Sequence, residues 1–143
     1  MIERLITEYD LWNYDYDINR KITLVAGDSG TGKTKFFDLC NTVLTHEYDL
    51  ECVDCRDEKV YRQFLEDIKV TENRLYIVDR LDANPSSIYD REIILRSSNQ
   101  FVIIGRDPQG LLLLPDNIKN IVYDTNNQKS YFINMLDNLY KGL

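Results

Sequence analysis

The part of the chain best suited to chemistry is a glycine-rich stretch at residues 27–34. It reads Gly27, Asp28, Ser29, Gly30, Thr31, Gly32, Lys33 and Thr34. Glycines permit left-handed backbone conformations, so successive N–H groups can point at one anion without side chains in the way. The lysine ammonium suits the β- and γ-phosphate oxygens of a nucleotide, and the threonine hydroxyl suits Mg²⁺. The spacing therefore predicts a polyphosphate site with a magnesium ion.

The elements on either side of this stretch are the ones such a site needs. Residues 21–26 form an apolar run typical of a buried strand. Residues 33–45 carry apolar side chains at helical spacing, namely Phe36, Leu39, Cys40, Val43 and Leu44. A helix that begins at Lys33 would add its unpaired N–H donors and the positive end of its dipole to the phosphate site.

Strand and helix patterns alternate along most of the remaining chain. We expect strands near residues 12–18, 49–53, 75–78 and 101–104, helices near 57–68 and 88–97, a hairpin of 118–123 with 129–133, and a short helix near 135–140. This alternation is typical of a parallel sheet with helices on both faces. We therefore predict an α/β fold, a three-layer α/β/α sandwich with a mainly parallel sheet. Antiparallel strands are expected at the N-terminal segment and in the C-terminal hairpin, all within one nucleotide-binding domain spanning residues 1–143.

Composition limits the partners. The chain has 143 residues with 17 Lys plus Arg against 24 Asp plus Glu, a formal charge of −7, and 43% hydrophobic residues. An acidic chain lacks the basic face that grips a nucleic-acid backbone. No apolar run approaches the roughly 20 residues that cross a bilayer. Three cysteines without a secretory signal indicate reduced thiols. We expect a cytoplasmic protein that contacts neither nucleic acid nor membrane.

Two motifs together resemble the P-loop NTPase superfamily. Residues 27–34 match the Walker A pattern G-x-x-x-x-G-K-[ST] at every fixed position, and Leu75-Tyr76-Ile77-Val78-Asp79 resembles a Walker B strand that ends in a carboxylate. The chain is most similar to a minimal core of the AAA and additional-strand ATPases. The resemblance implies ATP and Mg²⁺ as ligands, with Thr34 and Asp79 on the metal and Lys33 on the phosphates.

The strand at residues 101–104 is similar to the sensor strand of those ATPases, which lies between the two Walker strands. By this resemblance Arg106 would stabilise phosphate charge, with Asp107 orienting it. The alternative is that residues 107–110 only form a turn, for which Asp, Pro and Gly are well suited.

The chain also departs from the family pattern. Arg80 follows Asp79 where many hydrolysing relatives carry a catalytic glutamate. Other acids that could serve instead are Asp54, Asp57, Glu58 and Asp82, and their spacing selects none of them. The helical lid and second sensor of full AAA+ proteins are missing as well. Binding is therefore better supported than hydrolysis.

The sequence is compatible with three functions. The first is Mg-ATP binding with weak ATP hydrolysis that a protein partner or a second copy of the chain completes. The second is a small-molecule kinase, in which the segment around Asp54 and Asp57 holds the acceptor hydroxyl. The third is a non-hydrolysing, nucleotide-dependent interaction module. ATP is favoured over GTP because the N-K-x-D pattern of GTPases is absent.

An aromatic stripe precedes the glycine-rich stretch. Trp12, Tyr14 and Tyr16 alternate with polar residues, which is typical of a half-buried strand. Such a face could stack on adenine, but packing of the strand against its own sheet is the favoured interpretation.

Overall fold

The computed structural model describes residues 1–27, 32–84 and 87–137. Its strands are β1 (Arg4–Tyr9), β2 (Trp12–Asp17), β3 (Ile22–Ala26), β4 (Leu50–Asp54), β5 (Leu75–Asp79), β6 (Gln100–Ile104), β7 (Ile118–Asp124) and β8 (Lys129–Asn134). Its helices are α1 (Lys33–Thr42), α2 (Glu58–Val70) and α3 (Ile88–Arg96), with 3₁₀ turns η1 (Leu44–His46), η2 (Leu81–Ala83) and η3 (Pro115–Asn117).

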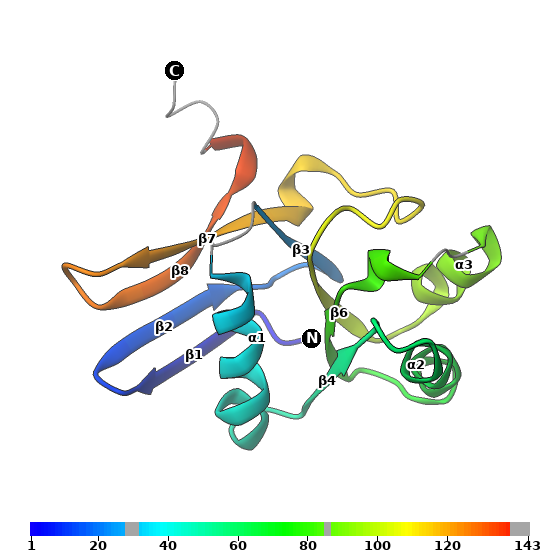
Figure 1. Ribbon diagram of the computed structural model, residues 1–143, viewed down its shortest axis with the longest axis horizontal. Coiled ribbons are helices and arrows are strands. Elements are labelled where there is room, and N and C mark those ends of the chain that lie inside the picture. The colour runs from blue at the N-terminus through cyan, green and yellow to red at the C-terminus, as the bar shows by residue number, and fades with distance from the viewer. Residues whose placement is uncertain (28–31, 85–86, 138–143) are drawn as a thin grey trace.

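All eight strands belong to one sheet with the order β1-β2-β8-β7-β3-β6-β5-β4 (Figure 1). The five strands β7, β3, β6, β5 and β4 run parallel to one another. At the other end of the sheet, β1 pairs with β2 and β7 pairs with β8 in antiparallel fashion, while β2 and β8 are parallel. The sheet is therefore mixed.

Helices cover the two faces of the parallel strands unequally. Successive strand residues point to opposite faces, so Ile77 and Val102 pack in one cluster with Phe36 of α1. Their strand neighbours Tyr76 and Phe101 pack in a second cluster with residues of α2 and α3. The two cores thus lie on opposite sides of β5 and β6, and α1 stands apart from α2 and α3 in Figure 1.

The prediction of a three-layer α/β/α sandwich is wrong. The sheet is a curled, mixed, half-barrel-like layer that contains more residues than the short helices among the described residues. Alternation of strand and helix stops after β6, because residues 105–117 return to β7 with only the turn η3. The antiparallel strands extend the sheet beyond the region that the helices cover, so no complete helical layers form.

Most individual elements match their predictions, including the hairpin of β7 and β8. Strand β1 was not predicted, because the hydrophobicity of its residues does not match their burial. Thr7 points inward and is buried, whereas Ile6 points outward and is 52% exposed. The predicted helix near residues 135–140 is helical at 135–137, and its remainder lies outside the described residues.

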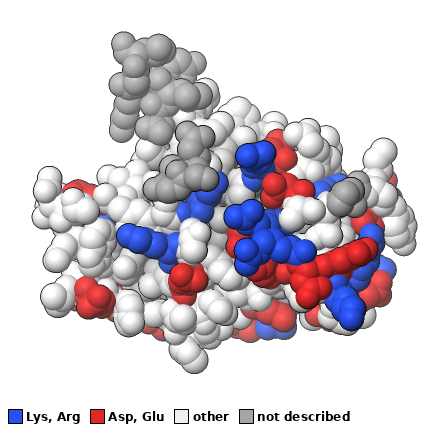
Figure 2. Space-filling model, viewed as in Figure 1, with Lys and Arg blue, Asp and Glu red and all other residues white. Residues whose placement is uncertain are grey.

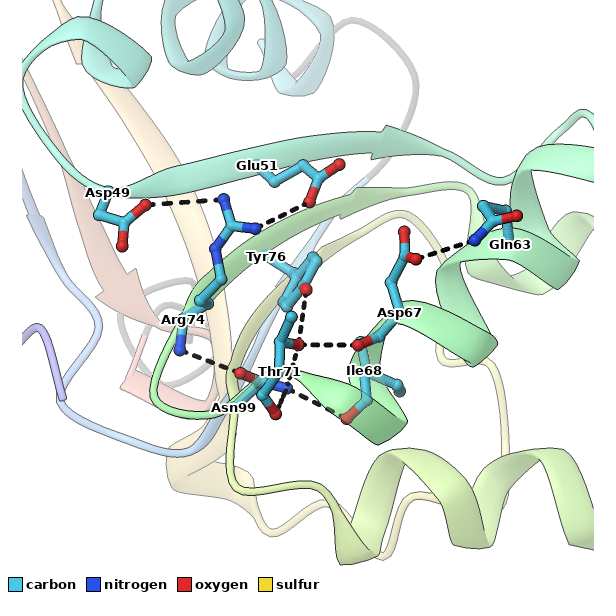
Figure 3. A network of polar contacts seen from close by, with 9 residues as sticks. All are labelled: Asp49, Glu51, Gln63, Asp67, Ile68, Thr71, Arg74, Tyr76 and Asn99. Carbon is cyan, nitrogen blue, oxygen red and sulfur yellow. Dashed lines mark hydrogen bonds and ion pairs between the residues drawn. The ribbon is translucent and has the colours of Figure 1, made fainter.

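A network of polar groups fixes the amino-terminal edge of β5 and β6 (Figure 3). The amide nitrogen of Asn99, which is buried, lies 3.0 Å from the Thr71 carbonyl oxygen and 3.3 Å from that of Ile68. Its amide oxygen accepts a hydrogen bond from the Arg74 N–H at 3.0 Å. One side chain therefore satisfies backbone groups at the end of α2 and at the start of β5.

We expect Asn99→Ala to lower the free energy of unfolding by about 2–4 kcal/mol, because it leaves several buried backbone groups without partners. Chemical denaturation measures the change. Gln63→Ala is the control, since Gln63 is exposed on α2 and bonds only the Asp67 carboxylate. That control should shift stability by less than about 0.5 kcal/mol. Equal losses in the two variants would contradict the role given to Asn99.

Candidate functional site

The carboxyl ends of the parallel strands meet at one edge of the sheet, and a cavity of about 550 Å³ opens there. The chain leaves β3 toward β4 through α1, whereas it leaves β6 in the opposite direction toward β7. A crevice at such a switch point is where open parallel sheets usually bind ligands. The cavity is lined by Lys33, Thr34, Phe37, Asp38, Asp54, Arg56, Asp79, Arg80, Asp82, Ala83, Ile104, Gly105 and Arg106.

Among the described residues, the lining carries four cationic and four acidic side chains. Figure 2 shows positive and negative groups interleaved over the ends of β4 and β6, between α1 and α2. The cations are Lys33, Arg56, Arg80 and Arg106, and the acids are Asp38, Asp54, Asp79 and Asp82. The cavity is therefore close to neutral at pH 7, which matters for any ligand with several negative charges.

The carboxyl-terminal end of the glycine-rich stretch, Lys33 and Thr34, lines this cavity. Gly27 follows β3 with φ of 135°, and Gly32 precedes α1 with φ of 92°. Lys33 begins α1, and its ammonium donates a hydrogen bond to the Gly27 carbonyl oxygen. Thr34 follows on the first turn. The predicted phosphate ligands Asp28, Ser29, Gly30 and Thr31 lie outside the described residues.

Strand β7 contacts Ala26, just before this stretch, and Gly32 within it. The Asn120 side chain donates to the Ala26 carbonyl oxygen at 3.1 Å, and the Tyr123 hydroxyl donates to that of Gly32 at 3.2 Å. A Cβ atom built on Gly32 would lie 2.1 Å from the Tyr123 ring, so only glycine fits there. Burial raises the pKa of Tyr123 to about 12, so this hydroxyl stays protonated, and able to donate, well into the alkaline range. Sequence reasoning missed both contacts, because nothing local relates residue 123 to residue 32.

Asp79 and Asp54 stand side by side in register at the ends of β5 and β4. Burial, and next the charge of Asp54, raise the pKa of Asp79. The Arg56 guanidinium makes a bidentate contact with Asp54, with an Nη2–Oδ2 distance of 2.6 Å, and its hydrogen bonds lower the pKa of Asp54. Of the two carboxylates, Asp54 is neutralised within the chain and Asp79 is not.

The structure distinguishes between the acidic residues that the sequence offered in place of the catalytic glutamate. Asp54 and Asp82 line the cavity. Asp57 instead caps α2, where its Oδ1 accepts from the Lys59 N–H at 2.8 Å, and Glu58 lies exposed on the first turn of α2. Asp57 and Glu58 therefore serve the helix N-terminus rather than the cavity.

Strand β6 lies between β3 and β5, as expected for the strand that ends near Arg106. Arg106 lines the cavity. Asp107 does not orient it, because its carboxylate accepts a hydrogen bond from the Gln109 N–H at 2.9 Å and forms a turn. The turn at Asp107 is therefore present, and Arg106 beside it lines the cavity.

The aromatic stripe on β2 packs against the chain itself. Tyr16 is fully buried and donates to the Ser130 hydroxyl at 2.7 Å. The Trp12 ring lies 6.3 Å from Tyr14 and 6.0 Å from Tyr123, centroid to centroid. The packing interpretation is confirmed for Tyr16.

Oxygen donors that suit Mg²⁺ are present in the cavity. The Thr34 hydroxyl and the Asp79 carboxylate both line it, and Mg²⁺ prefers one or two such protein ligands with the rest supplied by phosphate and water. In the described ranges there is no group of three or more His, Cys, Asp or Glu side chains arranged for a metal ion. Two protein oxygens with a bound phosphate therefore fit better than an all-protein site.

Comparisons with protein families, with curated proteins and with solved structures find no match for this chain. Among its described residues, no helix combines the length and the apolar character needed to span a membrane.

We expect Asp79→Asn to raise the free energy of unfolding at pH 7 without added Mg²⁺. A carboxyl whose pKa is raised by folding destabilises the native state once it is ionised. The gain should shrink as the pH falls toward about 4, where the unfolded chain is also protonated. Urea unfolding of both proteins at pH 7 and at pH 4 measures it.

Asp54→Asn is the matched control, because the two carboxylates are neighbours and receive the same substitution. The pKa of Asp54 is lowered, so its charge stabilises the fold above the unfolded pKa and is lost as the pH falls. This variant should be less stable than the parent at pH 7. A loss of stability in Asp79→Asn at pH 7 would contradict the electrostatic assignment.

Proposed function

We propose that this chain binds ATP as its magnesium complex, in the manner of a P-loop NTPase, and hydrolyses it weakly without a partner. One observation carries the proposal: Lys33 and Thr34, which end the glycine-rich stretch, line the same cavity as Asp79, 45 positions later in the chain. If residues 27–34 formed only a glycine turn, nothing would require an apolar strand to end in a carboxylate at the same cavity.

Each side chain has a distinct role in this proposal. Residues 27–34 supply backbone donors to the phosphates, Lys33 turns from the Gly27 carbonyl to the β- and γ-phosphate oxygens, and Arg106 stabilises charge on the terminal phosphate. Thr34 and Asp79 hold the Mg²⁺ ion, which supplies charge neutralisation between the phosphates. The cavity volume lies within the usual range of small-molecule sites.

The balanced charge of the cavity explains why the metal is needed. Free ATP would bring about four negative charges toward four carboxylates. Of these four, Asp54 alone is paired with a cation among the described residues. Magnesium lowers the charge of the ligand and gives Asp79 an opposite charge to face. We therefore expect much weaker binding of ATP without Mg²⁺.

Hydrolysis is proposed to be slow because no glutamate follows Asp79, where many hydrolysing P-loop ATPases carry a catalytic one. Arg80 occupies the following position, and Asp54 is engaged by Arg56. A protein partner or a second copy of the chain would supply the missing group. The three free cysteines, of which Cys40 and Cys55 are buried, support a reducing compartment such as the cytoplasm.

A kinase remains the second candidate, because Asp54 lines the cavity from β4 and could accept the proton of an acceptor hydroxyl once Arg56 moves away. Phosphate released to water without any acceptor would count against it. A protein that binds nucleotide without turnover would instead be a nucleotide-dependent interaction module.

We expect Lys33→Ala to weaken Mg-ATP binding by at least about tenfold, because a charge-assisted contact to phosphate is lost. Isothermal titration with Mg-ATP, and with ATP plus a chelator, measures it. Lys35→Ala is the matched control: it removes the same charge two positions away, from an exposed side chain outside the cavity lining. Equal affinity in Lys33→Ala and the parent would exclude the proposed site.

Phosphate release tests the role of Arg106. We expect Arg106→Ala to reduce release by about tenfold or more while Mg-ATP binding changes by less, since its charge acts mainly on the terminal phosphate. A coupled phosphate assay beside the binding titration separates the two effects. If release and binding fell in parallel, Arg106 would be a binding group only.

A further inference from the structure

The guanidinium groups of this protein are almost all accounted for by contacts within the chain. The chain has nine arginines, all among the described residues. Six pair with carboxylates: Arg4, Arg20, Arg56, Arg62, Arg74 and Arg96. A seventh, Arg91, is buried and donates to the carbonyl oxygens of Pro108 and Gln109. Arg80 and Arg106 alone make no hydrogen bond or ion pair through their side chains with another described residue.

These two arginines face the same cavity from adjacent strands. Arg80 follows the last residue of β5, and Arg106 stands two residues after β6. The backbone beneath them is fixed: the Arg80 N–H donates to the Ile104 carbonyl oxygen at 3.0 Å, and the Gly105 N–H donates to that of Val25 at 3.1 Å. Both side chains therefore extend from a rigid sheet edge.

The backbone at Arg80 is strained for its residue type. Arg80 has φ of 55° and ψ of 46°, the left-handed region that glycine or asparagine adopts more readily. Its carbonyl oxygen accepts from the Ala83 N–H at 3.0 Å, which holds it in that conformation. A long cationic side chain at a left-handed position, with nothing in the chain to bond it, indicates a role outside folding.

Acidic neighbours act on this pair only at a distance. The charge of Arg80 lowers the pKa of both Asp54 and Asp79, yet neither carboxylate lies within 4 Å of its guanidinium. Asp82 lies under Gly105, where a Cβ atom would be 3.1 Å from its Oδ1, and makes no ion pair with Arg106. The forks of Arg80 and Arg106 are thus open to an external anion.

We propose that Arg80 and Arg106 form a two-arginine site for a phosphate group, separate from the contacts that Lys33 makes. Guanidinium forks bind phosphate bidentately, and two of them match the charge of a phosphate dianion. The phosphate belongs either to the terminal group of the nucleotide or to a second, phosphorylated small molecule bound beside it. The first source rests on the proposed function, whereas the second needs only the cavity.

Titration with inorganic phosphate, followed by calorimetry or by ³¹P line broadening, tests the site directly. We expect Arg80→Asn and Arg106→Ala each to weaken phosphate binding by about tenfold or more, with Arg80→Lys intermediate because it keeps the charge but loses the fork. Asparagine accepts the left-handed backbone, so Arg80→Asn removes the guanidinium without adding strain. Arg96→Ala, on the exposed face of α3, is the control and should bind as the parent does.

A second titration distinguishes the two sources of phosphate. If phosphate binds the ADP-loaded protein but is displaced by ATP, the pair holds the terminal phosphate of the nucleotide. If phosphate also binds in the presence of saturating ATP, the pair holds a second phosphorylated molecule. Either result supports a two-arginine site, provided that the same phosphate-binding signal is lost in Arg80→Asn.

Several outcomes would overturn the site. They are an absence of phosphate binding at millimolar concentration, affinity unchanged in Arg80→Asn and Arg106→Ala, or an equal loss in Arg96→Ala. Phosphate binding abolished by Lys33→Ala but not by Arg80→Asn would assign the phosphate to the glycine-rich stretch instead. If ATP failed to bind the parent protein, the proposed function would be excluded. The titration with inorganic phosphate would still test the two-arginine site.

Discussion

The insertion of β6 between β3 and β5 is the constraint on which the rest of the structure depends. Hydrogen-bonded ladders to both neighbours fix its register, so Ile104 ends level with Val25 on one side and Asp79 on the other. At its other end, the Gln100 amide donates to the carbonyl oxygens of Ile2 and Ile18, both at 2.7 Å. One short strand therefore aligns the cavity edge and also ties the N-terminal hairpin to the parallel strands.

The amino-terminal and carboxyl-terminal ends of the parallel strands differ in how their polar groups are satisfied. At the amino-terminal edge, Asn99 and its neighbours satisfy each other, which favours stability. At the carboxyl edge, Asp79 carries a penalised charge and Arg80 a strained backbone without side-chain partners. Marginal stability leaves room for a few such costs only where they serve another purpose. The two ends of the parallel strands therefore differ in how fully their polar groups are satisfied within the chain.

The sequence was informative where a feature is local. Residues 27–34, the apolar strand before Asp79 and the strand before Arg106 are continuous stretches whose patterns can be read directly. The contact of Tyr123 with Gly32 could not be predicted, because it depends on the register of β7 beside β3. The curled sheet was not predicted for a related reason. Strand β1 buries Thr7 and exposes Ile6, so hydrophobicity does not show which face of this strand is buried.

The pairing of β2 with β8 has a consequence for how the chain folds. Tyr14 lies opposite Ser130, so β2 can pair with β8 only after a strand much later in the chain has been made. The same holds for Gly32, whose neighbour Tyr123 emerges some 90 residues later. Contacts of such long sequence separation slow folding, because a long loop must close before they form. Gly32 therefore gains its contact with Tyr123 only after β7 has been synthesised and has joined the sheet.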